Sequence, residues 1–151
     1  MIIKRFFKNQ QNGSSLIEVL VTMIIISLGL LGQAGLVALS SKANNAAFMR
    51  SQATLLADDI LERLRLNRAL AVAGSFNVVY GGTIPSGTAI QNVELRDWKA
   101  NVAQALSSGD GQVSVDGAGN VTINITWSEV AKGSPVDGTI TPTVFSTQSV
   151  I

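Results

Sequence analysis

Few side chains in this sequence could do chemistry, and the main candidates are carboxylates. The 151-residue chain contains no histidine and no cysteine. A Ser-His-Asp triad, an imidazole metal site, thiol chemistry and disulfide bonds are therefore excluded. Three acids close together, Asp58, Asp59 and Glu62, suggest a metal site or a catalytic dyad. Arginines are interleaved with them, which favours a solvated helix face that carries salt bridges.

Two further acids, Asp110 and Asp116, lie beside glycines and suggest a calcium loop. Their spacing lacks the regular series of Asp and Asn ligands that such a loop requires. Turn chemistry explains them better, because Asp side chains bond to the backbone of tight turns. We therefore expect no catalytic residue, no metal and no cofactor, and a protein that is not an enzyme.

The remaining candidate, Glu18, lies just inside a long apolar run. Residues 19–41 carry no formal charge, and as a helix they would span about 35 Å, enough to cross a bilayer core of about 30 Å. Lys4, Arg5 and Lys8 precede the run without any acid, which predicts a cytoplasmic N-terminus and an exported remainder. An ionised carboxylate costs about 2.5–3.5 kcal/mol at the centre of a membrane helix and less near its end. A glutamate here is by default a functional residue with a partner.

The stretch from Gly13 to Leu39 resembles the class III signal of type IV prepilins, with Glu18 five residues after Gly13 and an unbroken apolar helix behind it. The resemblance implies that a membrane peptidase cuts between Gly13 and Ser14 and that the amine of Ser14 is methylated. Ser14 departs from the family, whose first mature residue is commonly phenylalanine, but cleavage depends chiefly on the glycine. The resemblance also implies that Glu18 neutralises the terminal amine of an adjacent subunit; the alternative places Glu18 in the lipid headgroup zone.

Gly29, Gly32 and Gly35 recur every three residues within the apolar run. Small residues let membrane helices approach closely, and each glycine weakens a helix by about 1 kcal/mol relative to alanine. Pilin helices loosen at this depth when they pack into a filament, so the resemblance implies local melting at Gly29–Gly35. Ordinary glycine use in a membrane helix is the alternative.

The apolar run continues into a stretch without proline or glycine, from Ser40 to Ala73. Apolar residues recur there at three- to four-residue spacing, which predicts a helix with one buried face: Ala53, Leu56, Ile60 and Leu64. We expect one helix over Ser15–Ala73, half free and half packed on a domain, with Gly74 as its stop. The expected organisation is a basic leader over residues 1–13, a transmembrane and filament-core segment over 14–39 and an exported head over 40–151.

The rest of the chain predicts a small antiparallel sheet and one short helix, hence an α+β, pilin-like fold. Turn residues dominate 75–91, apart from a strand-like Val78–Tyr80. Trp98 and Trp127 are expected core anchors, and Pro142 suggests an edge strand or a bulge. The expected elements are a helix over about Val93–Ser107 and strands over Gln112–Val115, Val121–Trp127 and about Thr139–Val150, with a hairpin loop at Asp116–Asn120.

Residues 50–68 resemble the helix of the type IV pilus modification proteins, the minor pilins called PilV. The resemblance implies a structural subunit that primes or modifies pilus assembly, with roles in adhesion and twitching motility. Implied partners are other minor pilins, the major pilin, the prepilin peptidase, the inner-membrane assembly platform and a tip adhesin. The protein would be a single-pass inner-membrane precursor that then joins the pilus at the cell surface.

Two rival hypotheses remain open at this point. One is a pseudopilin of a type II secretion system, and the other is a small secreted binding domain with an ordinary signal peptide. Gly32-Gln33-Ala34 could serve as the cleavage site of such a signal. Three of the eleven cationic side chains lie in residues 1–13, so the remainder has eight against ten acids. That weakly acidic remainder has no electrostatic footprint for nucleic acid.

Overall fold

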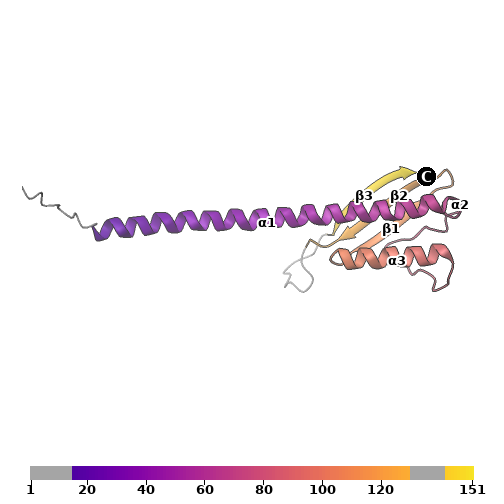
Figure 1. The fold of residues 1–151 in the computed structure, drawn as a ribbon, viewed down its shortest axis with the longest axis horizontal. Coiled ribbons are helices and arrows are strands. Elements are labelled where there is room, and N and C mark those ends of the chain that lie inside the picture. Colours follow the sequence, from indigo (N-terminus) through magenta and orange to yellow (C-terminus); the bar gives the residue numbers. More distant parts are fainter. Residues whose placement is uncertain (1–14, 130–141) are drawn as a thin grey trace, which may run out of the picture. The chain divides into compact units, whose positions relative to one another are not determined.

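A computed structural model describes residues 15–129 and 142–151 (Figure 1). Within these residues the chain forms three helices and three strands: α1 (Leu16–Leu66), α2 (Arg68–Val72), α3 (Ile90–Ala105), β1 (Asp110–Val115), β2 (Asn120–Trp127) and β3 (Thr143–Val150). The predicted α+β fold, a long N-terminal helix with a small antiparallel sheet, is confirmed. The chain divides into two compact units, Met1–Ala43 and Asn44–Ile151.

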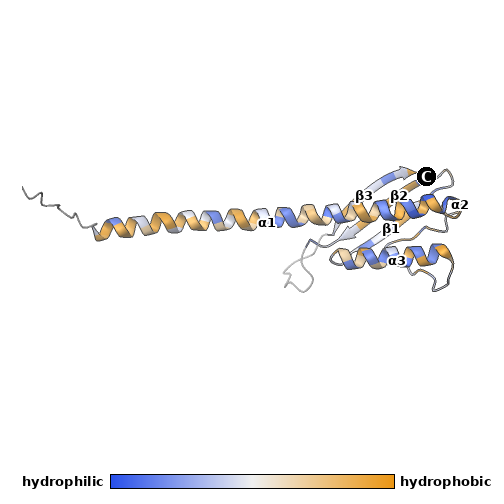
Figure 2. Cartoon of the chain, in the orientation of Figure 1, coloured by the Kyte–Doolittle hydropathy of each residue, from blue (hydrophilic) through white to orange (hydrophobic). Residues whose placement is uncertain are grey.

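The described part of the first unit is the apolar portion of α1. Leu, Ile, Val and Met fill it without a proline, so the backbone hydrogen bonds run uninterrupted from Leu16 onward. Its side chains are exposed throughout. Apolar residues dominate this portion, whereas polar residues interrupt the later turns of α1 (Figure 2).

The prediction of one helix as far as Ala73 is wrong at Asn67, which separates α1 from α2. The backbone of Asn67 leaves helical geometry, with φ −115° and ψ 39°. Its side-chain amide donates to the Arg63 carbonyl oxygen at 3.0 Å, the same acceptor that its own N–H uses at 3.1 Å. Asparagine competes with the helix in this way because its short amide can bond to nearby backbone groups.

Gly74 ends α2, as predicted for the helical segment as a whole. Its φ of +78° lies in the left-handed region that glycine adopts without strain. The Gly74 N–H donates to the Ala71 carbonyl at 2.9 Å, and the Ser75 N–H donates to the Leu70 carbonyl at 3.0 Å. This pair of bonds is a Schellman motif, which satisfies the last carbonyls of the helix.

The core of the second unit lies between the later turns of α1, helix α3 and the sheet. The buried face of α1 consists of Ala53, Ala57, Ile60 and Leu64, each at most 2% exposed. Leu56, predicted for this face, is only half-buried beside it. Alanines on the buried face leave room for large side chains from the neighbouring elements.

Both tryptophans are buried, as predicted for core anchors. Trp98 on α3 donates its indole N–H to the Leu56 carbonyl oxygen of α1 at 2.8 Å. Its ring lies over Gly111 of β1, where an added Cβ would be 2.2 Å from the Trp98 Cη2 atom. Trp98 therefore ties α1, α3 and β1 together. The indole nitrogen of Trp127 has no hydrogen-bond partner in the part of the chain that the structure describes.

The sheet has the order β1-β2-β3, and both pairs of strands are antiparallel. Alternate residues of the central strand β2 are buried: Val121, Ile123, Ile125 and Trp127. Asp116 shapes the predicted hairpin loop, because its carboxylate accepts from the backbone N–H groups of Ala118 and Asn120 at 2.9 and 2.8 Å. These bonds, with the side-chain amide of Asn120 first, lower the pKa of Asp116.

Several helix and strand boundaries differ from those predicted from the sequence. Helix α3 covers Ile90–Ala105 instead of Val93–Ser107, and β1 begins at Asp110 instead of Gln112. The described part of the last strand begins at Thr143, because Pro142 precedes the ladder and residues 139–141 lie outside the described residues. The strand is nevertheless an edge strand, as Pro142 suggested. Val78–Tyr80 contributes only an isolated bridge, between Val78 and Val113.

Candidate functional site

The apolar portion of α1 is the candidate functional site, because no described residue of the chain packs on it. Every residue from Ser15 to Asn45 is exposed. Among residues 15–129 and 142–151, α1 is the one helix long and apolar enough to cross a membrane. An α-helix suits that environment because its backbone groups bond within the segment. Length and composition alone fit a signal sequence equally well, so the particular residues of the helix must distinguish the two.

Glu18 lies in the first turn of α1, with its side chain exposed. Its backbone N–H donates to the Ser15 carbonyl at 2.9 Å, and its own carbonyl accepts from the Thr22 hydroxyl at 2.7 Å. A negative charge in the first turn is favoured by the helix dipole. The carboxylate itself makes no hydrogen bond or ion pair with any described residue. Its charge is therefore unpaired within residues 15–129 and 142–151.

The polar side chains near Glu18 are compatible with an apolar environment. The hydroxyl of Thr22 donates to the Glu18 carbonyl and that of Ser27 to the Met23 carbonyl, both at 2.7 Å. Each hydroxyl group thus donates its hydrogen bond to a backbone carbonyl of the same helix. Glu18 is the one acidic residue of the described apolar portion, and no described residue supplies a counter-charge to it.

Gly13 and Ser14 lie outside the described residues, so cleavage and methylation there stay predictions. Gly29, Gly32 and Gly35 lie within continuous α-helix, and no atom comes within 4 Å of a Cβ built on any of them. They leave the backbone of α1 open to close approach by another helix. The predicted melting at Gly29–Gly35 also stays a prediction, since it concerns the packed filament.

Several acids of the second unit form ion pairs within it. Asp59 pairs with Arg63 at 3.1 Å, and Glu62 pairs with Arg65 on the exposed face, which agrees with the predicted helix face that carries salt bridges. Arg63 also forms an ion pair with Glu94 of α3. Burial would lower the pKa of Arg63, but the hydrogen bonds to Asp59 and Glu94 raise it. The sequence did not indicate this link between helices, because Glu94 is 31 residues away from Arg63.

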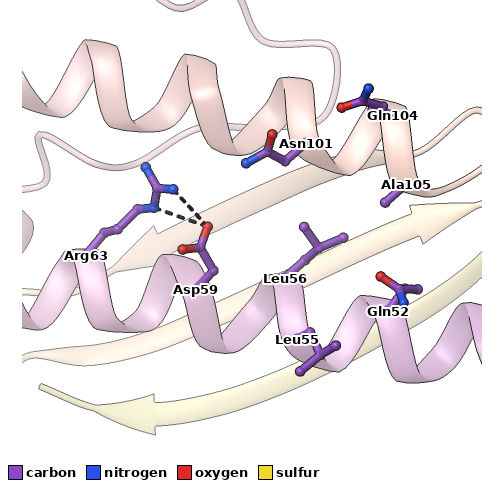
Figure 3. Close-up of a pocket in the computed structure, with 8 residues that line it drawn as sticks. All are labelled: Gln52, Leu55, Leu56, Asp59, Arg63, Asn101, Gln104 and Ala105. Carbon is purple, nitrogen blue, oxygen red and sulfur yellow. Dashed lines mark hydrogen bonds and ion pairs between the residues drawn. The ribbon is translucent and has the colours of Figure 1, made fainter.

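An open groove of about 450 Å³ runs between α1 and α3 beside the Asp59–Arg63 ion pair (Figure 3). The side chains that line it are Gln52, Leu55, Leu56, Asp59, Arg63, Asn101, Gln104 and Ala105. The one carboxylate in the lining, that of Asp59, is paired with Arg63. The other lining side chains are mainly amides and leucines, and none is a nucleophile with a base beside it. In the described residues no group of three or more His, Cys, Asp or Glu side chains could hold a metal ion.

Asp110 connects three segments of the second unit. Its Oδ1 atom accepts from the Gly111 N–H at 2.7 Å and pairs with the Lys99 Nζ at 2.9 Å, while Oδ2 accepts from the Gly81 N–H at 2.6 Å. Burial alone would raise the pKa of Asp110, but the bonds from Lys99, Gly81 and Gly111 lower it. Asp110 therefore fixes β1 to α3 and to the loop at Gly81, and does more than the turn chemistry predicted for it.

The comparison with known protein families bears on the first unit. Residues 8–32 match the family described as "Prokaryotic N-terminal methylation motif". The matched residues include Gly13, Ser14 and Glu18 and extend to Gly32. No curated protein and no solved structure matches the chain. The motif is of the type IV prepilin kind, so it supports a place for the chain in the type IV pilin superfamily, as a pilin or a pseudopilin.

Proposed function

We propose that the protein is a minor pilin of a type IV pilus. It would be made as a single-pass inner-membrane precursor with a cytoplasmic N-terminus, cut between Gly13 and Ser14, and methylated at Ser14. The observation that carries the proposal is the methylation motif over residues 8–32, which continues into the unpacked apolar portion of α1. An ordinary signal peptide has no use for Glu18 or for a helix that extends without a break into a folded head.

Glu18 would act during assembly, as the partner of the terminal amine of Ser14 on the adjacent subunit. A carboxylate and an amine that enter an apolar bundle separately each cost several kcal/mol. Pairing removes much of that cost, so the bundle favours the register in which the two groups meet. The free carboxylate of Glu18 and its position one turn into the helix support this role.

The second unit would choose the neighbours of the subunit. The resemblance of residues 50–68 to the PilV minor pilins supports a role in priming or modifying assembly over one as the major subunit. On this proposal the partners are the major pilin, other minor pilins, the prepilin peptidase, the assembly platform and a tip adhesin. The protein would be a substrate of an enzyme and would catalyse nothing itself.

The proposal predicts that Glu18→Gln abolishes assembly without abolishing membrane insertion. The amide keeps the shape of the side chain but leaves the incoming amine without a counter-charge, at a cost of about 3–5 kcal/mol in a dry bundle. We expect the amount of the subunit in sheared filaments to fall at least about tenfold. Immunoblots of filament and membrane fractions measure it.

Glu62→Gln is the matched control, because Glu62 lies on the exposed face of α1 in the second unit. It should leave incorporation unchanged. Equal incorporation of Glu18→Gln and the wild type would contradict the role of Glu18. Deletion of the gene separates the pilin from the pseudopilin, since loss of surface pili supports the first and loss of protein secretion with pili retained supports the second.

A further inference from the structure

The two edges of the sheet differ in how their backbone groups are satisfied. The outward N–H and C=O groups of Val113 on β1 bond to Val78 at 2.9 Å each. The Asn77 side chain then imitates a strand: its Oδ1 accepts from the Val115 N–H at 2.7 Å, and its Nδ2 donates to the Val115 carbonyl at 3.2 Å. The outward N–H of Gly111 donates to Asp110. The edge formed by β1 is therefore closed.

Among residues 15–129 and 142–151, nothing pairs with the outer edge of β3, which we call the open edge. The Ile151 N–H donates to the Gly119 carbonyl at 2.9 Å, so odd-numbered residues at this end direct their backbone groups towards β2. In an antiparallel ladder the intervening residues direct theirs away from the sheet. These are Val144, Ser146, Gln148 and Val150. None of their backbone groups has a hydrogen-bond partner in the described residues, and Figure 1 shows β3 on the far side of β2 from β1.

Strand β3 also lacks the usual protection of a free edge. Natural edge strands carry charges, prolines or bulges, or are short. Strand β3 has eight residues, with no charged residue and no proline, and its register with β2 runs without a bulge from Val150 to Thr143. Val144 and Val150 are 57% and 64% exposed. At about 3.3 Å per residue the open edge is about 26 Å long.

We propose that the open edge of β3 is a docking surface for an extended segment of a different protein, which adds to the sheet as a further strand. Main-chain hydrogen bonds to Val144, Ser146, Gln148 and Val150 would supply the affinity, as in other cases of strand addition. Because β3 carries no charge, the incoming strand presents uncharged residues of high strand propensity to it.

The closed edge of β1 decides against head-to-tail addition of further copies, since β3 of one copy finds no free edge on the next. Antiparallel pairing of β3 with β3 would relate two copies by a two-fold axis perpendicular to the sheet, so the later turns of α1, which share the core with the sheet, would run in opposite directions in the two copies. In subunits that enter one membrane with the same orientation, α1 runs in the same direction, so this pairing is disfavoured. This choice of a different protein as the occupant rests on the proposed function.

The test is photo-crosslinking of the full chain in cells that assemble the filament. A benzophenone amino acid replaces Ser146 on β3, and in the matched control it replaces Ser114, an exposed residue of β1. We expect an adduct with a different protein from position 146 only, mapped by mass spectrometry to an extended uncharged segment. An adduct with a second copy, with residues 130–141 of the same chain, from both positions, or from neither would overturn the proposal.

A second set of variants tests the main-chain bonds. Gln148→Pro removes an outward N–H and leaves the ladder with β2 intact, while Gln148→Ala keeps that N–H. We expect Gln148→Pro to lower the adduct from position 146 at least about fivefold, the factor that one lost hydrogen bond implies. Gln148→Ala should leave it unchanged. Should the proline variant not fold, Gln148→Lys places a charge on the edge and should lower the adduct likewise; an unchanged adduct would contradict strand addition.

These results are separate from those that test the proposed function. Mature protein that does not begin at Ser14 contradicts the pilin pathway whatever happens at β3. Correct processing without the adduct contradicts strand addition alone.

Discussion

The carboxylates of this chain differ in the groups that surround them, and we expect different roles from them for that reason. Glu18 has no partner among the described residues and lies in an apolar helix, which is why we propose that its partner is on another subunit. Asp110 has three donors within its own domain, and Asp116 has the backbone of its own loop. The sequence indicated the first and the last of these roles. It could not indicate the second, because Gly81 is 29 residues away from Asp110.

Asp110 should give the fold a pH dependence at the acid end. Its pKa is lower in the folded chain than the unfolded value of about 3.9. Its contribution to stability is therefore complete above the unfolded pKa and is lost as the pH falls through the folded pKa. Asp110→Asn should lower the melting temperature near pH 7 and reduce its further fall below about pH 4.

Melting curves of the full chain in detergent, recorded by circular dichroism across this pH range, measure the effect. Asp58→Asn is the control, because Asp58 is exposed and makes no ion pair among the described residues. An acid transition of the same size in Asp110→Asn and the wild type would show that Asp110 is not its source.

At the scale of elements, Arg63 should matter more than its neighbour Arg65. Arg63 joins α1 to α3 through Asp59 and Glu94 and is 23% exposed, whereas Arg65 pairs with Glu62 on the surface and is 45% exposed. Arg63→Met leaves a half-buried Glu94 without its cation, so we expect a loss of about 1–3 kcal/mol in the free energy of unfolding. Arg65→Met should change it by less than about 0.5 kcal/mol. Urea titration compares them, and equal losses would contradict the link between helices.

The contact between α3 and β1 predicts a severe effect of one methyl group. A Cβ at Gly111 would be 2.2 Å from the ring of Trp98, which is itself buried and hydrogen-bonded to α1. Gly111→Ala should therefore destabilise the fold by about 1–3 kcal/mol or more. Gly117→Ala is the matched control, since nothing lies within 4 Å of its Cβ position. Indistinguishable melting temperatures for the two variants would contradict the close packing of Trp98 on Gly111.

The predicted elements are those that depend on local patterns. Apolar spacing predicted Ala53, Ile60 and Leu64 of the buried face of α1, and Asp116 with its glycines predicted the hairpin. The break at Asn67 was missed because no proline or glycine marks it, only an amide that competes for the Arg63 carbonyl. The pairing of Asn77 with Val115 was missed because it joins residues 38 apart. Which edge of the sheet is open follows from that pairing and from the register, which no local pattern contains.

At the scale of the molecule, the two units differ in whether their apolar side chains are covered. The described part of Met1–Ala43 exposes its apolar side chains and contains Glu18, whereas Asn44–Ile151 has its own buried core. The exposed apolar side chains of the first unit would be best covered by a bilayer or by a bundle of similar helices. The motif at residues 8–32 falls wholly within this unit. Processing of the N-terminus is therefore the step that separates a pilin from a protein with an ordinary signal peptide.

The most direct measurement is N-terminal sequencing and intact mass of the protein from membranes of a cell with its native peptidase. We expect the mature chain to begin at Ser14 and to carry one methyl group on its amine, as the proposed prepilin pathway requires. A chain that begins near Gly35 and is free in the periplasm would contradict it. The apolar helix would then be an ordinary signal peptide, and the function would have to be sought in the second unit alone.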